Sequence, residues 1–197
     1  MSELAQTVAD AVESLVGTRW PIVDAHANVP HVPGLYAVYG THSAWADLKL
    51  TECDVARPLY VGKAEDSFVS RDLRTHFASG RTGQSTVRRS FAALLRESLQ
   101  LHGIPRNPEK PGHFANFGLS PENDSQLTSW MWSNLSLAVW PTTGALPLRA
   151  VEAEVVKRLD PPLNIEYLPP NSRTELSAAR RAMADEARQW ASLKESP

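Results

Sequence analysis

The chain has 197 residues, a formal net charge of −2 and a pI near 6.3, with 42% hydrophobic and 21% charged residues. These values are typical of a folded globular chain, and they exclude both a disordered protein and a uniformly basic one. A nucleic-acid partner would therefore need a local basic region. The single cysteine, Cys53, excludes an internal disulfide, and no signal peptide or membrane-length apolar segment stands out, so we expect a cytoplasmic protein with no membrane partner.

The first half of the chain alternates helix-like and strand-like patterns. Apolar residues at four-residue spacing predict a helix over 3–16, and the proline-punctuated segment 21–33 is expected to be extended. Aromatic and β-branched residues next to glycines predict strands over 34–40 and 58–62, separated by a long polar loop or ragged hairpin. A helix is expected to begin near Asp66 or Ser67, both good N-cap residues, and to end at about Ala78.

The second half is mostly helical. We expect helices over 87–101, 126–135, 146–160 and 171–194, one strand over 136–141, and an irregular, proline-containing connector over 103–123. This order predicts an α/β protein of the α+β type, in which helices surround a small mixed sheet. The expected organisation is an N-terminal helix and lead-in (1–32), a main domain (33–168) and a C-terminal helix (169–197).

Several side chains suit the hydrolysis of a phosphodiester. That reaction needs a divalent cation, a positive group on the phosphate oxygens and a group that activates water. The candidates lie on the predicted strands, on the helices and in the loops beside them: Tyr36, Tyr60, Lys63, Arg71, Arg74, Glu152 and Asn164.

Taken together, the motifs resemble those of a known family. GLY at 34–36 and YVG at 60–62 resemble the paired tripeptides of the GIY-YIG nucleases, and EAEVVKRLDPPLN at 152–164 is similar to their second signature. The resemblance spans residues 33–166. It implies a three-stranded, mainly antiparallel sheet flanked by helices, and metal-dependent endonuclease activity on nucleic acid, with DNA favoured over RNA.

The resemblance also implies roles for individual residues. Tyr36 and Tyr60 match the two family tyrosines, one of which helps to activate water. Lys63 matches a lysine near the phosphate or the activating tyrosine, and Glu152 matches the glutamate that binds Mg²⁺ or Mn²⁺. Asn164 matches the asparagine that shapes the site.

The helix after the second strand matches the family less closely. His76 matches a histidine that some branches carry there, but the expected arginine position, just before Leu73, holds Asp72. Arg71 lies one residue further back, a rotation of about 100° around a helix. We expect Arg71 to reach the phosphate, and the alternatives are that Arg74 replaces it or that the site is weakened.

Arginines concentrate on this helix and in the segment that follows it. Arg74, Arg81, Arg88 and Arg89 are the candidate nucleic-acid-binding residues, because the guanidinium group suits phosphate oxygens. Each candidate also has an ordinary structural interpretation. The two tyrosines could be half-buried strand residues, His76 a packed core histidine, and Glu152 a glutamate that the helix N-terminus favours. Asn164 could be a turn residue, and the arginines could form a solvated basic face. The alternative functions are a catalytically weak or inactive nucleic-acid-binding module of the same fold, and an adaptor that binds a partner protein.

Overall fold

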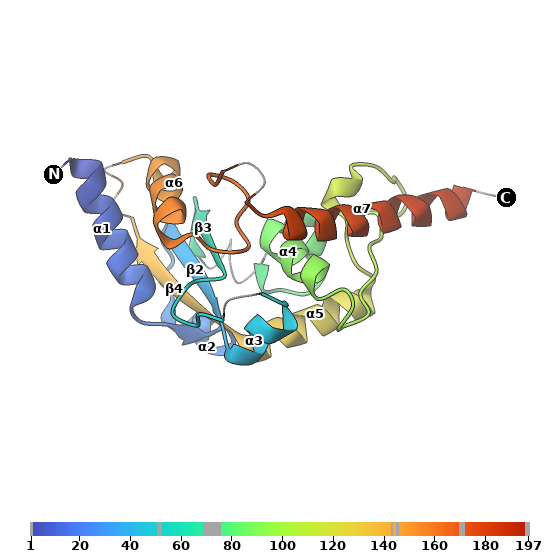
Figure 1. Cartoon of the computed structure of the whole chain (residues 1–197), viewed down its shortest axis with the longest axis horizontal. Helices are drawn as coiled ribbons and strands as arrows, with labels where there is room; N and C mark the ends of the chain where they lie inside the picture. Colours follow the sequence, from blue (N-terminus) through green and yellow to red (C-terminus); the bar gives the residue numbers. More distant parts are fainter. Residues whose placement is uncertain are drawn as a thin grey trace.

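The computed structural model describes the chain except for residues 1, 51–52, 69–75, 143, 145, 170–171 and 196–197. The described elements, in chain order, are α1 (Glu3–Val16), β1 (Trp20–Pro21), α2 (Ile22–Asn28), β2 (Gly34–Gly40), α3 (His42–Asp47), β3 (Tyr60–Ala64), the short 3₁₀ turn η2 (Thr82–Gln84), α4 (Thr86–Leu94), the 3₁₀ turn η3 (Phe114–Asn116), α5 (Pro121–Asn134), β4 (Leu135–Pro141), α6 (Leu148–Leu159) and α7 (Thr174–Glu195) (Figure 1). None of the described helices is long and apolar enough to cross a membrane.

The strands form one antiparallel sheet in the order β1-β4-β2-β3. This confirms the predicted α+β fold with its antiparallel sheet and terminal helices. The two-residue strand β1, which pairs with β4, adds an edge that the sequence did not indicate. On the other side, β3 pairs only with β2 in the sheet, so one of its edges lies outside the ladder.

Two short helices correct the prediction: α2 lies in the segment 21–33 that was expected to be extended, and α3 lies in the expected polar loop or ragged hairpin that follows β2. In α2, Ile22 and Ala25 are buried, and in α3 Ala44 and Trp45 are buried, so tertiary packing stabilises helices too short to form alone. Thr41 also caps α3, because its hydroxyl accepts a hydrogen bond from the Ala44 amide at 3.2 Å. The helix expected to begin near Asp66 falls largely on 69–75, outside the described residues.

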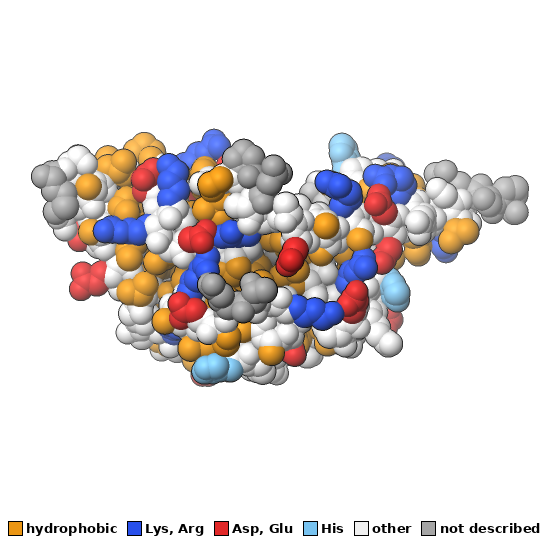
Figure 2. Space-filling view, viewed as in Figure 1, with side chains coloured by type: hydrophobic (Ala, Val, Ile, Leu, Met, Phe, Trp, Pro, Cys, Tyr) orange, Lys and Arg blue, Asp and Glu red, His pale blue; other side chains and the backbone are white. Residues whose placement is uncertain are grey.

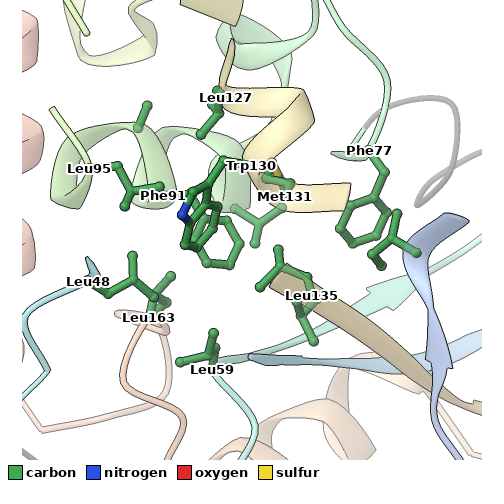
Figure 3. Close-up of a cluster of buried hydrophobic side chains, with 14 of the residues drawn as sticks. Leu48, Leu59, Phe77, Phe91, Leu95, Leu127, Trp130, Met131, Leu135 and Leu163 are labelled. Carbon is green, nitrogen blue, oxygen red and sulfur yellow. The ribbon is translucent and has the colours of Figure 1, made fainter. Parts of the chain in front are cut away.

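Hydrophobic cores lie on both faces of the sheet. Alternate residues of β2 divide between them: Leu35 and Ala37 pack with α1 and α6, whereas Tyr36 and Val38 belong to the core that includes α4 and α5. Figure 3 shows part of this second core, in which Phe91 of α4 meets Trp130 of α5. Burial on both faces fixes which way each β2 side chain points.

The free edge of β3 is held by the turn after α6. The Asn164 side chain accepts a hydrogen bond from the Val61 amide at 2.9 Å and donates one to the Val61 carbonyl at 2.8 Å. The Leu163 amide also donates to the Leu59 carbonyl at 2.9 Å, and both leucine side chains enter the core (Figure 3). Asn164 therefore does for β3 what a neighbouring strand would do, and it joins the end of α6 to the sheet.

Asn164→Ala should lower the free energy of unfolding by about 2–4 kcal/mol, because it leaves two buried backbone groups of Val61 without partners. Chemical denaturation measures this change. Asn28→Ala is the control: its side-chain amide also donates to a backbone carbonyl, that of Asp24, but this hydrogen bond is exposed to solvent, so the loss should stay within about 0.5 kcal/mol. Equal losses in the two variants would contradict the assigned role of Asn164.

Candidate active site

A pocket of about 610 Å³ lies beside the free edge of β3, and it brings together predicted residues from separate parts of the chain. Tyr36 comes from β2, Tyr60 and Lys63 from β3, Glu152 from α6 and Asn164 from the turn that follows. Clefts that combine apolar walls with a few convergent polar groups are the usual sites of ligand binding. Figure 1 shows β3 between α6 on one side and α4 with α7 on the other.

The two tyrosines lie on the same face of the sheet because of the strand register. Tyr36 pairs with Gly62, two residues from Tyr60, and the two rings lie 6.1 Å apart between centroids. A Cβ atom at Gly62 would be 2.5 Å from the Tyr36 hydroxyl and 2.8 Å from a ring carbon of Tyr60. Glycine is therefore required at position 62 to leave room for both phenols.

His76 lies behind Tyr36 and is not among the residues that line the pocket. The histidine and Tyr36 ring centroids are 5.7 Å apart, and His76 is 1% exposed. Its Nδ1 is hydrogen-bonded to the Ser85 hydroxyl at 2.6 Å, which also caps α4 by accepting from the Arg88 amide. This placement suits a residue that positions Tyr36.

Glu152 is a buried carboxylate, 7% exposed, on the pocket wall. Burial raises its pKa from the ordinary 4.5 to about 7, although nearby Lys63 and a hydrogen bond from Tyr167 act in the opposite direction. The Tyr167 hydroxyl donates to Oε2 of Glu152 at 3.3 Å. Tyr167 has a φ of 68°, which a non-glycine residue seldom adopts, at the turn that carries its phenol to the pocket.

Comparison with known families agrees with this geometry. The family model of the GIY-YIG catalytic domain matches residues 36–182, well over half of the chain. The chain belongs to the GIY-YIG family. The family consists of phosphodiester hydrolases, so the pocket belongs to a nuclease. Comparisons with curated proteins and with solved structures gave no match.

GIY-YIG nucleases generally use a divalent metal ion, and the pocket residues fit one. Glu152 is buried, and no lysine or arginine lies within ion-pair distance of it among the described residues, so a cation would offset an unbalanced charge. Glu166 lines the same pocket. The part of the chain that the structure describes holds no group of three or more His, Cys, Asp or Glu side chains that could bind a metal. Few carboxylate ligands, with water completing the shell, are typical of Mg²⁺ sites.

The arginines predicted to contact nucleic acid differ in their burial, and two of them are not described by the structure. Arg71 and Arg74 lie outside the described residues. Arg81 is exposed, where a nucleic acid can reach it, and its guanidinium donates to the Gln84 side chain at 3.2 Å.

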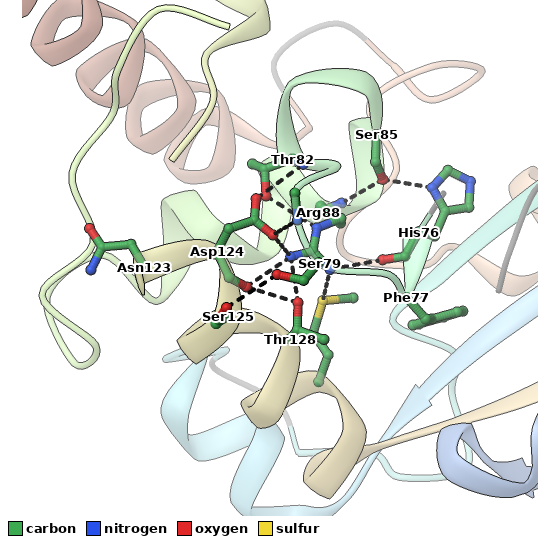
Figure 4. A network of polar contacts seen from close by, with 12 residues as sticks. His76, Phe77, Ser79, Thr82, Ser85, Arg88, Asn123, Asp124, Ser125 and Thr128 are labelled. Atoms are coloured by element: carbon green, nitrogen blue, oxygen red, sulfur yellow. Dashed lines mark hydrogen bonds and ion pairs between the residues drawn. The ribbon is translucent and has the colours of Figure 1, made fainter. Parts of the chain in front are cut away.

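The assignment of Arg88 to nucleic-acid binding is wrong, because Arg88 is 0% exposed. Its guanidinium forms an ion pair with Asp124 and donates to the Thr82 and Thr128 hydroxyls (Figure 4). It also donates to the His76 carbonyl at 3.2 Å. Such a paired, hydrogen-bonded charge joins α4 to α5, and removing one partner would leave the other charge buried alone.

Arg89 is also almost buried, at 6% exposed. It donates to the Gly83 carbonyl at 3.0 Å and to the Thr86 hydroxyl at 3.3 Å. Arg89 therefore lies beneath the surface that Thr86 presents to the pocket, instead of on an open basic face.

Apart from the apolar Leu163 and Ile165, the sequence interpretation missed five polar residues of the pocket. Thr86, Arg149, Glu166, Tyr167 and Arg180 line the pocket with the predicted ones. Glu166 and Tyr167 follow Asn164 closely, so their position next to the second motif was a usable signal. Arg180 lies on α7, far from every motif, and only the packing of α7 reveals it.

Gly62→Ala should displace both phenol rings and cost about 1–3 kcal/mol of stability, because the added methyl group has no room. Denaturation measures the stability and a crystal structure of the variant shows the rings. Gly112→Ala is the matched control, since a Cβ there meets nothing within 4 Å. Unmoved rings in the Gly62 variant would contradict the account of this glycine.

Glu152→Gln should stabilise the metal-free protein at about pH 8. Because the pKa of Glu152 is raised from 4.5 to about 7, the folded protein retains a proton that the unfolded chain releases, and stability falls as pH rises between these values. The variant lacks this loss, so its advantage should reach up to about 3 kcal/mol above pH 7 and vanish near pH 4.5. Denaturation in EDTA across this range measures it. Glu154→Gln, on the exposed side of α6, should show no such trend, and a pH-independent effect at Glu152 would contradict the prediction.

Proposed function

We propose that the protein is a metal-dependent endonuclease that hydrolyses phosphodiester bonds in DNA. The convergence of Tyr60, Lys63 and Glu152 on one pocket carries the proposal. These residue types can activate water, stabilise charge on phosphate oxygens and bind a hard cation, which are the needs of the reaction. The family match supplies the general nuclease activity, and the metal and the DNA substrate are what we add.

We assign Tyr60 to contact the attacking water. Tyr60 is half-buried and lines the pocket, whereas Tyr36 is 1% exposed between Gly62 and His76. Tyr36 then holds the Tyr60 ring in position, and His76 holds Tyr36. This assignment gives the two family tyrosines different tasks.

Lys63 is the pocket ammonium that we expect to meet a phosphate oxygen. In the free protein it forms an ion pair with Glu65, whose side chain is 71% exposed. Because exposed ion pairs contribute little, a phosphate can replace Glu65 at small cost. The β2–β3 register places Lys63 opposite Leu35, on the face of the sheet that packs against α6, which carries Glu152.

Glu152, oriented by the hydroxyl of Tyr167, would hold Mg²⁺ or Mn²⁺. The bound ion would supply Lewis-acid stabilisation of the charge that develops on the phosphate. Glu152 must lose its proton to bind the ion, and binding therefore depends on pH. Asn164 contributes by holding the β3 backbone between Tyr60 and Gly62.

Glu152→Ala should slow cleavage by 10²-fold to 10³-fold or more, because metal stabilisation amounts to several kcal/mol. The assay compares supercoiled plasmid, branched DNA, single-stranded DNA and RNA with Mg²⁺, Mn²⁺ or EDTA. DNA affinity should stay near the wild-type value, since phosphate-binding cations are retained.

Glu154→Ala is the matched control on α6. Its carboxylate pairs with Lys157 at 2.7 Å, on a side of the helix that does not line the pocket, and cleavage should match wild type. A Glu152→Ala protein that cuts at the wild-type rate would show that the mechanism is wrong. Wild-type protein that binds DNA and cuts no substrate would favour the inactive binding module.

A further inference from the structure

The side of the molecule drawn in Figure 2 carries no broad basic face among its described residues. On the side drawn in Figure 2, lysine and arginine side chains are interspersed with aspartate and glutamate. This agrees with the net charge of −2. Phosphate binding therefore depends on individual cations, and those inside the pocket are the first to consider.

Three described cations line the pocket, and two of them have carboxylate partners. Lys63 pairs with Glu65, and Arg149 pairs with Glu166 at 3.3 Å. Arg180 is half-buried on α7, and among the described residues it forms no ion pair with a carboxylate. Its titratable neighbours in that part of the chain are the Arg89 guanidinium and the neutral Tyr60 phenol, neither of which is a carboxylate.

Arg89 adds a second uncompensated charge behind Arg180. Within the described residues Arg89 also lacks a carboxylate partner, and its buried Nε has no hydrogen-bond partner there. Burial, followed by the nearby charges of Arg180 and Arg106, lowers the pKa of Arg89 to about 10. Like charges that converge without an acid are unfavourable in the free protein, and an anion would relieve them.

We propose that Arg180, with Arg89 behind it, binds a phosphate group of the nucleic-acid backbone on the Tyr60 side of the pocket. The inference rests on the proposed function and adds a phosphate-binding residue from the C-terminal helix α7. A guanidinium group suits this ligand because its fork can donate two hydrogen bonds to phosphate oxygens. α4 and α7 pack together, so Arg89 and Arg180 lie on adjacent helices (Figure 1).

The test measures binding without cleavage. Glu152→Gln protein in EDTA is titrated against a labelled DNA oligonucleotide by fluorescence anisotropy over a series of salt concentrations, with and without Arg180→Ala. Loss of Arg180 should weaken binding about tenfold or more. It should also reduce the slope of log affinity against log salt by about 0.7–0.9, the value of one phosphate contact. Arg180→Lys, which keeps the charge and loses the fork, should give an intermediate affinity.

Arg181→Ala is the matched control. It removes the same charge from the next position of α7, where the side chain is exposed and faces a different pocket, and it should change affinity and salt slope less. Thermal unfolding separates binding from folding: because Arg180 has cationic neighbours and no acid partner in the described structure, Arg180→Ala should unfold no earlier than its parent. Equal effects of the two substitutions, or a lowered unfolding temperature in Arg180→Ala alone, would overturn the inference.

The outcome for Arg180 is distinct from the outcome for catalysis. If wild type cleaves DNA and Arg180→Ala binds and cleaves equally well, the inference fails and the nuclease function stands. If wild type cleaves nothing but binding falls in Arg180→Ala, the phosphate site stands and the proposed metal-dependent cleavage fails. If no DNA or RNA binds at all, both are overturned.

Discussion

The paired hydrogen bonds between Asn164 and the Val61 backbone are the constraint on which the site depends. Strand β3 lies at the edge of the sheet and would otherwise leave its outer backbone groups without strand partners. By holding that edge, one side chain fixes the end of α6 relative to β3. The distance between the Glu152 carboxylate and the tyrosine-bearing strand is thereby determined by the fold and does not depend on a mobile loop.

The pocket combines two charges that the free protein does not balance well. The Glu152 carboxylate is buried and forms no ion pair among the described residues, and Arg89, which is buried, and Arg180, which is half-buried, form no ion pair with an acid there. Both arrangements cost stability in isolation, and such costs are common where a ligand supplies the missing charge. A divalent cation and a phosphate together would balance both. The side chains that make the free pocket electrostatically unfavourable are thus the same ones that we propose bind the metal ion and the phosphate.

Much of this could be predicted from the sequence, because the motif residues lie where local patterns are strong. The aromatic and β-branched residues between the two glycines of GLYAVYG predict β2 at its observed bounds, and the helix predicted over residues 3–16 is α1. Short helices were missed, since α2 and α3 are stabilised by contacts distant in sequence. The arginines were the weakest case: composition alone does not distinguish the buried Arg88 from exposed Arg81, and Arg180 reaches the pocket through helix packing.

The most direct test of the account is a crystal structure of the protein with Mn²⁺ and a DNA oligonucleotide that carries a non-cleavable phosphate analogue. Anomalous scattering locates the metal independently of the rest of the density. The account predicts a manganese peak about 2 Å from a Glu152 carboxylate oxygen and a backbone phosphate beside Arg180, within hydrogen-bonding distance of about 3 Å. Manganese bound away from Glu152, or DNA bound to another face of the protein, would contradict it.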